Sequence, residues 1–243
     1  MSKRKPSLIV VIAEGISDED ALYPNLKKVS KKLKVHFEFV GGDVFTARKN
    51  QRKPAKAIIG DIIREEIISK PEFEKEDIKL IVQLTDTDGV YISDDNIVID
   101  ESQSDRTEYT LENIRVDSLN QLQEIKNRNY VKRRALDILS TTGKVTERFN
   151  YKILYFSRNL DHVISDNPDT LKSEKSKAAD AFSNSFTTAN DFEKFFSASD
   201  FTVDGTYDET WTFIKSDAKS LKKFTNFHLI FEMLREITNN TND

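Results

Sequence analysis

Two aspartates at the end of one apolar run are the residues of this sequence best suited to chemistry. The run from Lys79 to Leu84 is rich in Ile, Leu and Val, and Asp86, Asp88 and Gly89 follow it. A short apolar run of this kind predicts a buried strand. Residues two apart on an extended chain face the same side, so these carboxylates could share a divalent cation. Because Asp and Gly are also ordinary turn residues, the pattern alone favours a turn.

The beginning of the chain repeats this arrangement. Residues 6–13 form a second apolar run of strand length, which ends at Glu14 and Gly15. Ser17 stands where an N-cap is expected, and Asp20 follows three residues later as an acidic form of the capping box that opens a helix. The order strand, carboxylate, helix is therefore predicted here.

The elements between these two acidic ends predict that the ends meet. An alternating run at 35–40 predicts one more strand, and helical spacing of apolar residues predicts helices over 18–33 and 54–69. Helices between strands imply parallel crossovers, and parallel strands end at one edge of the sheet. Open α/β sheets bind their ligands at that edge. We therefore expect Glu14 to converge with the two aspartates.

The sequence around both acidic ends resembles the motifs of Toprim domains. Residues 11–22 look like the first Toprim motif, and residues 84–89 look like the Asp-x-Asp motif. Toprim domains occur in topoisomerases, primases, recombination proteins and the OLD-type nucleases of phage defence, and their acidic triad binds magnesium and acts on phosphodiesters. The resemblance covers roughly residues 7 to 92, with a continuation to about 165. It implies an α/β, Toprim-like (Rossmann-like) fold with a mostly parallel sheet flanked by helices.

The resemblance also implies roles for the acidic residues. Glu14 would be the general acid or base and would contact the metal, while Asp86 and Asp88 would hold Mg²⁺ or Mn²⁺. Magnesium is usually held by few carboxylates together with water and phosphate oxygens, which leaves room for a substrate. A nuclease would add a second ion to clamp the attacking and leaving oxygens, and the sequence does not show which acids would hold it.

A further strand is predicted near residues 151–156, and polar residues follow it as well. Arg158 is a candidate phosphate contact, and Asp161 is a candidate additional metal ligand. The alternative is that Asn159 and Asp161 cap the next helix. The sequence alone leaves both interpretations open.

Basic residues after the second predicted strand could hold a polyanion. The formal net charge is −4, but the local charge matters more than the sum. The loop and the helix behind it carry the candidate DNA- or RNA-binding residues Arg48, Lys49, Arg52, Lys53 and Lys56. Two other basic clusters, at 27–34 and 132–134, are more simply explained as solvated helix faces.

The middle of the chain predicts an insertion followed by helices. Residues 91–118 are acidic and irregular, and the short apolar pieces at 97–99 and 109–111 predict a small β excursion. This insertion could act as a lid, although an exposed acidic loop is the simpler explanation. Residues 119–142 return to a helical pattern, with a break between two helices expected at 127–129.

The end of the chain predicts a helical extension. Phenylalanines recur through 165–200, which indicates a helical cap that packs them on the body rather than a disordered segment. An amphipathic helix is predicted over 216–237, with fraying from 238 onward. We therefore expect a Toprim-like catalytic domain over 1–165 and a mainly helical C-terminal cap over 166–243.

Composition excludes several classes of protein and site. The absence of Cys excludes a disulfide scaffold, a thiolate zinc site and a Cys nucleophile. Only 7 glycines and no Gly-rich phosphate loop argue against ATP hydrolysis by this chain. Charged residues make up 32% of the sequence and no apolar run has membrane-spanning length, so a cytoplasmic protein without a membrane contact or a signal peptide is expected.

Three functions from different classes are consistent with these patterns. The first is a Mg²⁺-dependent Toprim-type nuclease, a metal-dependent endonuclease that cuts nucleic-acid phosphodiesters in phage defence with a separate ATPase or sensor protein as partner. The second is a Toprim-like nucleic-acid-binding or regulatory module that does not cleave. The third is a Mg²⁺-dependent α/β enzyme that acts on a small phosphorylated substrate. The choice between DNA and RNA and the formation of a homo-oligomer stay open.

Overall fold

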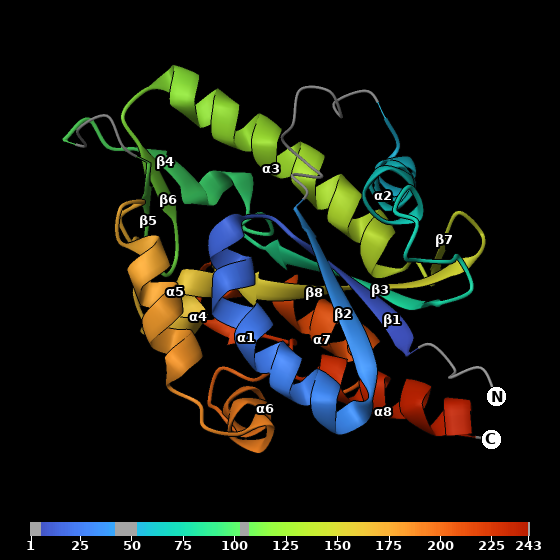
Figure 1. Ribbon diagram of the computed structural model, residues 1–243. Helices are drawn as coiled ribbons and strands as arrows, with labels where there is room; N and C mark the ends of the chain where they lie inside the picture. Colours follow the sequence, from blue (N-terminus) through green and yellow to red (C-terminus); the bar gives the residue numbers. More distant parts are fainter. Residues whose placement is uncertain (1–5, 42–52, 103–106, 243) are drawn as a thin grey trace.

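A mostly parallel sheet forms the centre of the computed structural model, which describes residues 6–41, 53–102 and 107–242 (Figure 1). The strand order is β2-β1-β3-β8-β7, and β9 pairs with β8 outside this path. The parallel strands are β1 (Ser7–Ala13), β2 (Val35–Gly41), β3 (Ile78–Asp86) and β8 (Phe149–Ser157). The short strands β7 (Lys144–Val145) and β9 (Phe224–Thr225) run antiparallel to β8. The predicted parallel strands are confirmed.

Helices cover both faces of this sheet, because the strand side chains alternate between two apolar clusters. In β1, Ile9 and Val11 belong to one cluster, while Val10 and Ile12 belong to the other. The first cluster packs against α1 (Ile16–Leu33), α5 (Lys175–Asn184), α6 (Ala189–Ser197) and α8 (Leu229–Asn242). The second packs against α2 (Ala55–Ile63), its π-helical continuation (Arg64–Ile68), α3 (Leu119–Ser140) and α7 (Tyr207–Ile214). The fold is therefore α/β and compatible with a Rossmann-like arrangement.

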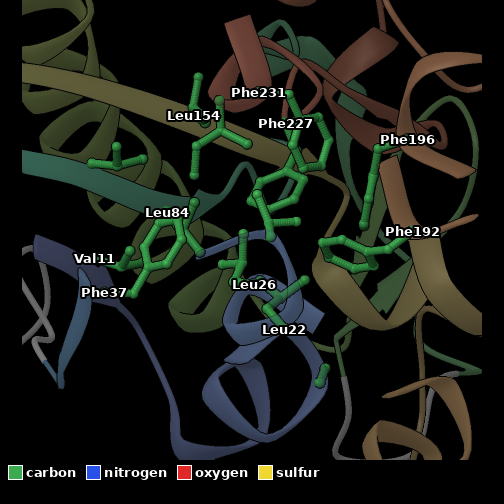
Figure 2. Packing of buried hydrophobic residues seen from close by; sticks show 14 of the residues in the cluster. Val11, Leu22, Leu26, Phe37, Leu84, Leu154, Phe192, Phe196, Phe227 and Phe231 are labelled. Atoms are coloured by element: carbon green, nitrogen blue, oxygen red, sulfur yellow. The ribbon is translucent and has the colours of Figure 1, made fainter. Parts of the chain in front are cut away.

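Phenylalanines from the second half of the chain complete the first cluster. Figure 2 shows Phe192 and Phe196 of α6 beside Phe227 and Phe231, on the side of the sheet where Leu22 of α1 packs. The expected packing of these rings on the body is confirmed. The domain boundary at residue 165 stays a prediction, since residues from both sides of it share this cluster and β9 extends the central sheet.

Phe196→Ala tests this packing. The side chain of Phe196 is 0% exposed and its ring lies 4.6 Å from that of Phe227, centroid to centroid. Its removal is expected to lower the free energy of unfolding by about 3 to 5 kcal/mol, because a cavity replaces a well-packed ring. Urea denaturation measures this loss. Phe73→Ala, at a half-buried ring, is the matched control, and a loss as large as that of Phe196→Ala would contradict the assignment of Phe196 to the core.

The helix break expected at 127–129 is wrong, because α3 runs without interruption. Asn129 is buried inside this helix, and its side-chain oxygen accepts a hydrogen bond from Nη2 of Arg128 at 2.8 Å. A satisfied Asn oxygen does not compete with the helix backbone. Neither α3 nor any other helix of the described residues is long and apolar enough to cross a membrane.

The single helix expected over 216–237 is also wrong. A 3₁₀ turn (Lys219–Leu221) and β9 precede α8, which continues to Asn242 instead of fraying from 238. Contacts with β8 explain the difference: the side-chain oxygen of Asn226 accepts from the backbone N–H of Tyr155 at 2.8 Å, and the Thr225 hydroxyl donates to the Tyr155 carbonyl at 2.7 Å. Tertiary hydrogen bonds therefore override the helical spacing of the apolar residues.

The predicted β excursion is present as a second, small sheet. It has the order β4-β6-β5 and is built from β4 (Ile97–Ile99), β5 (Glu108–Tyr109) and β6 (Ile114–Val116), after a 3₁₀ turn (Asp94–Asn96). Apolar side chains of this excursion form a separate small cluster with Leu221. The excursion is thereby attached to the body beside the carboxyl end of β3.

Candidate metal and phosphate site

The candidate site lies where the strand order changes direction. From β1 the chain passes through α1 to β2, and it then crosses to β3 on the opposite side of β1 (Figure 1). Glu14 follows β1 and Asp86 ends β3, so both stand at the switch point where open α/β sheets place their ligands. The Thr85 hydroxyl donates to Oε1 of Glu14 at 2.7 Å, which links the two strand ends directly.

Lys132 of α3 lies among the carboxylates. Its Nζ is 2.7 Å from Oδ2 of Asp88 and 3.7 Å from Oε1 of Glu14, and the residue is only 4% exposed. The structure thus brings Glu14 and Asp88 together, as expected. The interpretation of Lys132 as part of a solvated helix face is wrong.

The sequence did contain a signal for this buried lysine. Asn129, Lys132, Leu136 and Leu139 are spaced by three or four residues and are all buried. Such spacing puts them on one helix face. The phase of the apolar residues therefore identifies Lys132 as inward-facing, whereas its charged neighbours suggested a solvent-exposed cluster.

A turn, rather than a continued strand, positions Asp88. The strand ends at Asp86, and Asp88 adopts a left-handed conformation with φ of 48°, followed by Gly89 with φ of 69°. A Cβ at Gly89 would lie 2.4 Å from Cδ2 of Leu221, so this position requires glycine. The backbone N–H of Asp88 donates to the Arg158 carbonyl at 2.9 Å. The two aspartates converge through this turn and not through the period of an extended chain.

Asp18 is a site residue that the sequence pattern assigned to no chemistry. The predicted cap was wrong, because Gly15 is the N-cap of α1 and the helix begins two residues earlier than expected. The carboxylate of Asp18, not that of Asp20, accepts the capping hydrogen bond, from the Gly15 N–H at 3.1 Å. The early start of the helix places Asp18 beside Glu14, one turn from the sheet edge.

Crowding of carboxylates shifts their proton affinities. Burial, followed by the charge of Glu14, raises the pKa of Asp18 to about 6. Burial together with the charges of Asp18, Glu14 and Asp88 raises the pKa of Asp86 well above its ordinary range. Burial and the neighbouring acidic groups therefore disfavour the ionised forms of Asp18 and Asp86.

Asp88 and Lys132 behave as an ion pair. Burial alone would raise the pKa of the Asp88 carboxyl, but the charge and hydrogen bond of Lys132, together with the charges of Arg128 and Arg158, lower it. Burial would likewise lower the pKa of Lys132, and the charges of Asp88 and Glu14 instead raise it. Both groups are consequently charged at neutral pH.

Asp161 and Asn159 have separate roles at the start of α4 (Leu160–Ser165). Asn159 is the N-cap and its side-chain oxygen accepts from the His162 N–H at 2.8 Å, so the capping interpretation is confirmed for Asn159. Asp161 is 7% exposed, and its Oδ2 lies 2.6 Å from Nζ of Lys175 on α5. The Leu160 N–H donates to Oδ1 of Asp86 at 3.0 Å. The start of α4 therefore borders the acidic cluster.

The predicted phosphate-binding residues do not gather around the acidic cluster as the carboxylates do. Nζ of Lys53 lies 2.6 Å from Oδ2 of Asp61, and Lys56 is exposed. Arg158 is buried and forms an ion pair with Asp169. Three further candidates, Arg48, Lys49 and Arg52, lie outside the described residues.

The donor set fits a hard divalent cation by its chemistry. Carboxylate oxygens are the ligands that Mg²⁺ prefers, and one or two of them suffice when water and phosphate complete the shell. Within the described ranges, no three His, Asp or Glu side chains are arranged to share one ion, and Lys132 lies between Glu14 and Asp88. Burial, followed by the charges of Asp18, Glu14 and Asp88, raises the pKa of Asp86, and a bound cation would favour its ionised form instead. The residues therefore suit a hydrated Mg²⁺ bound through few protein ligands.

Comparisons with protein-family models, with curated proteins and with solved structures found no match for this chain. The site itself, rather than a relative, therefore carries the functional argument.

Proposed function

We propose that this chain is a Toprim-type, Mg²⁺-dependent nuclease that hydrolyses nucleic-acid phosphodiester bonds. The observation that supports this most is the convergence of Glu14, Asp86 and Asp88 at the switch point of a parallel sheet, around the buried Lys132. The motif resemblance of residues 11–22 and 84–89 supports the same function.

The chain's own groups would divide the work as follows. Asp86 and Asp88 would hold Mg²⁺, which when bound lowers the pKa of its water and neutralises phosphate charge. Thr85 orients the Glu14 carboxylate by its hydrogen bond, so that Glu14 can take a proton from the attacking water or return one to the leaving oxygen. Lys132 keeps the Asp88 carboxylate ionised and ready to bind a cation.

Cleavage of plasmid DNA and of RNA with Mg²⁺ or Mn²⁺ tests this proposal. Glu14→Gln keeps an oxygen that accepts from Thr85 but removes the basic group, so cleavage is expected to fall by about a hundredfold or more. Asp180→Asn, which neutralises an exposed carboxylate on α5, is the matched control and should cleave like the wild type. Equal rates for Glu14→Gln and wild type would contradict the assignment.

A second candidate function is a Toprim-like binding module that does not cleave. It is favoured by Lys132, whose ammonium already compensates the charges of Asp88 and Glu14 as a resident metal would. Nucleic-acid binding that persists with chelator, with no cleavage by any combination of protein and metal, would support this alternative. Metal-dependent cleavage that is lost in Glu14→Gln supports the nuclease.

The Toprim resemblance also supports a cellular setting. A nuclease of this type would act in the cytoplasm, in phage defence, together with a separate ATPase or sensor protein. A neighbouring gene for an ATPase, and stimulation of cleavage by its product, would support that setting. A gene with no such neighbour would argue against it.

A further inference from the structure

Tyr109 of β5 contacts the side chains of two arginines that border the candidate site. Its hydroxyl oxygen accepts a hydrogen bond from Nη1 of Arg128 at 2.5 Å, and its carbonyl oxygen accepts one from Nη1 of Arg158 at 3.1 Å. The guanidinium of Arg158 also lies 4.4 Å from the centroid of the Tyr109 ring. A single residue of the excursion therefore contacts both guanidinium groups, and Arg128 additionally donates to the side-chain oxygen of Asn129.

Both arginines are tied to Asp88. Nη2 of Arg128 donates to the Asp88 carbonyl at 3.0 Å, and the Arg158 carbonyl accepts from the Asp88 N–H at 2.9 Å. The guanidinium of Arg128 therefore lies at Asp88, and the guanidinium of Arg158 lies on the other side of the Tyr109 contact, so a phosphate in the place of Tyr109 could meet both.

The contacts that Tyr109 offers are weaker than those of a phosphate. A guanidinium has donors in a fork that matches phosphate oxygens, and bonds between charged groups are roughly twice as strong as bonds to neutral oxygens. Tyr109 supplies only neutral oxygens and a ring face. Arg158 also forms an ion pair with Asp169. The residue is only 5% exposed, and the Tyr109 ring covers its guanidinium.

Tyr109 lies on a very short strand, so its side chain could be displaced from the two arginines. Its strand has two residues and pairs with β6 only through Glu108 opposite Arg115 and Tyr109 opposite Ile114. A pairing this short contributes little stability by itself. Besides this pairing, Tyr109 is held by its contacts with the two guanidinium groups and by partly buried packing against the small apolar cluster of the excursion.

We propose that Tyr109 is a built-in competitor of the substrate: it occupies Arg128 and Arg158, which bind backbone phosphates of a nucleic-acid strand when the ring withdraws. This inference rests on the proposed function, because it assumes that the site beside Asp88 receives nucleic acid. The apparent affinity of such a site is reduced by the fraction of molecules in which the competitor is withdrawn. Removal of Tyr109 therefore strengthens binding, whereas removal of a stacking platform would weaken it.

Fluorescence anisotropy with a labelled single-stranded oligonucleotide, measured in EDTA so that no cleavage occurs, tests the inference. Tyr109→Ala is expected to lower Kd by about five- to tenfold, the worth of one or two released charge-assisted contacts. Tyr109→Phe removes only the hydroxyl on Arg128 and should give part of that gain. Tyr130→Ala is the matched control, since Tyr130 makes the same kind of hydroxyl and ring contact with Arg134 on the exposed face of α3 and should leave Kd unchanged.

A double-variant cycle identifies the arginine. Arg128→Gln should weaken binding, and in that background Tyr109→Phe should bring no further gain, because the released hydrogen bond no longer exists. Weaker or unchanged binding in both Tyr109 variants, or no binding by any form of the protein, would overturn the inference. Tighter binding by Tyr109→Ala without cleavage under any metal condition would refute the nuclease alone, and cleavage with unaltered Kd in the Tyr109 variants would refute the competitor alone.

Discussion

Lys132→Met is expected to lower the free energy of unfolding by about 3 kcal/mol or more at neutral pH in the absence of divalent cations. The methionine side chain fills the buried space but removes the ammonium that lies 2.7 Å from Asp88 and 3.7 Å from Glu14. Four carboxylates, of Glu14, Asp18, Asp86 and Asp88, then repel one another without this counter-charge. Denaturant titration of both proteins measures the loss.

Divalent cations should restore much of this loss. Because Mg²⁺ would replace the missing positive charge, it should raise the Tm of Lys132→Met more than that of the wild type. Lys215→Met is the matched control: Lys215 also pairs with an aspartate, Asp137 at 2.8 Å, but at a partly exposed position where such pairs contribute about 1 kcal/mol or less. A Lys132→Met loss no larger than that of the control would show that the cluster does not depend on this lysine.

Asp86→Asn should strongly reduce metal-dependent cleavage and at the same time stabilise the fold. The asparagine oxygen can still accept from the Leu160 N–H, which lies 3.0 Å from Oδ1 in the wild type. The substitution removes a carboxyl whose ionisation is opposed first by burial and then by the charges of Asp18, Glu14 and Asp88, so both penalties disappear. We expect cleavage to fall by about a hundredfold or more, together with a higher Tm at neutral pH.

The pH dependence of stability tests the predicted stabilisation by Asp86→Asn. Since the pKa values of Asp18 and Asp86 are raised in the folded state, their stabilising contribution is fully present below their ordinary value of 3.8. It is lost as the pH rises through the raised pKa of each group, which is about 6 for Asp18. Asp88 acts in the opposite sense, because its lowered pKa gives stability that is lost only as the pH falls through that lowered value. Thermal unfolding from mildly acidic to neutral pH should therefore decline less steeply in Asp86→Asn than in the wild type. An equal or steeper decline, or a lower Tm at neutral pH, would contradict this account.

The strands and the convergence of the acidic ends could be predicted because both depend on short-range patterns. The apolar runs that become β1 and β3 end at Ala13 and Asp86, and helices between parallel strands bring such ends to one edge. The turn after Asp86 was predictable in the same way, since Asp and Gly are ordinary turn residues and Gly89 has a positive φ of 69°.

The charge balance of the site was less accessible from the sequence. Lys132 reaches the cluster from α3, far along the chain, and only the helical phase it shares with Leu136 and Leu139 marks it as buried. Asp18 joins because α1 begins directly after Gly15, a boundary that differs by two residues from the one the capping pattern suggested. Contacts such as Tyr109 with Arg128 unite segments that no local pattern relates.

Binding of Mn²⁺ to the wild type, followed by the electron paramagnetic resonance signal of the free ion, tests most directly whether the acidic cluster around Glu14, Asp86 and Asp88 binds a divalent cation. We predict that the wild type depletes this signal, that Mg²⁺ restores it by competition, and that Glu14→Gln and Asp88→Asn weaken binding by about tenfold or more, with Asp180→Asn unaffected. Mn²⁺ binding of equal strength in all four proteins, or no depletion by the wild type, would contradict the proposed site.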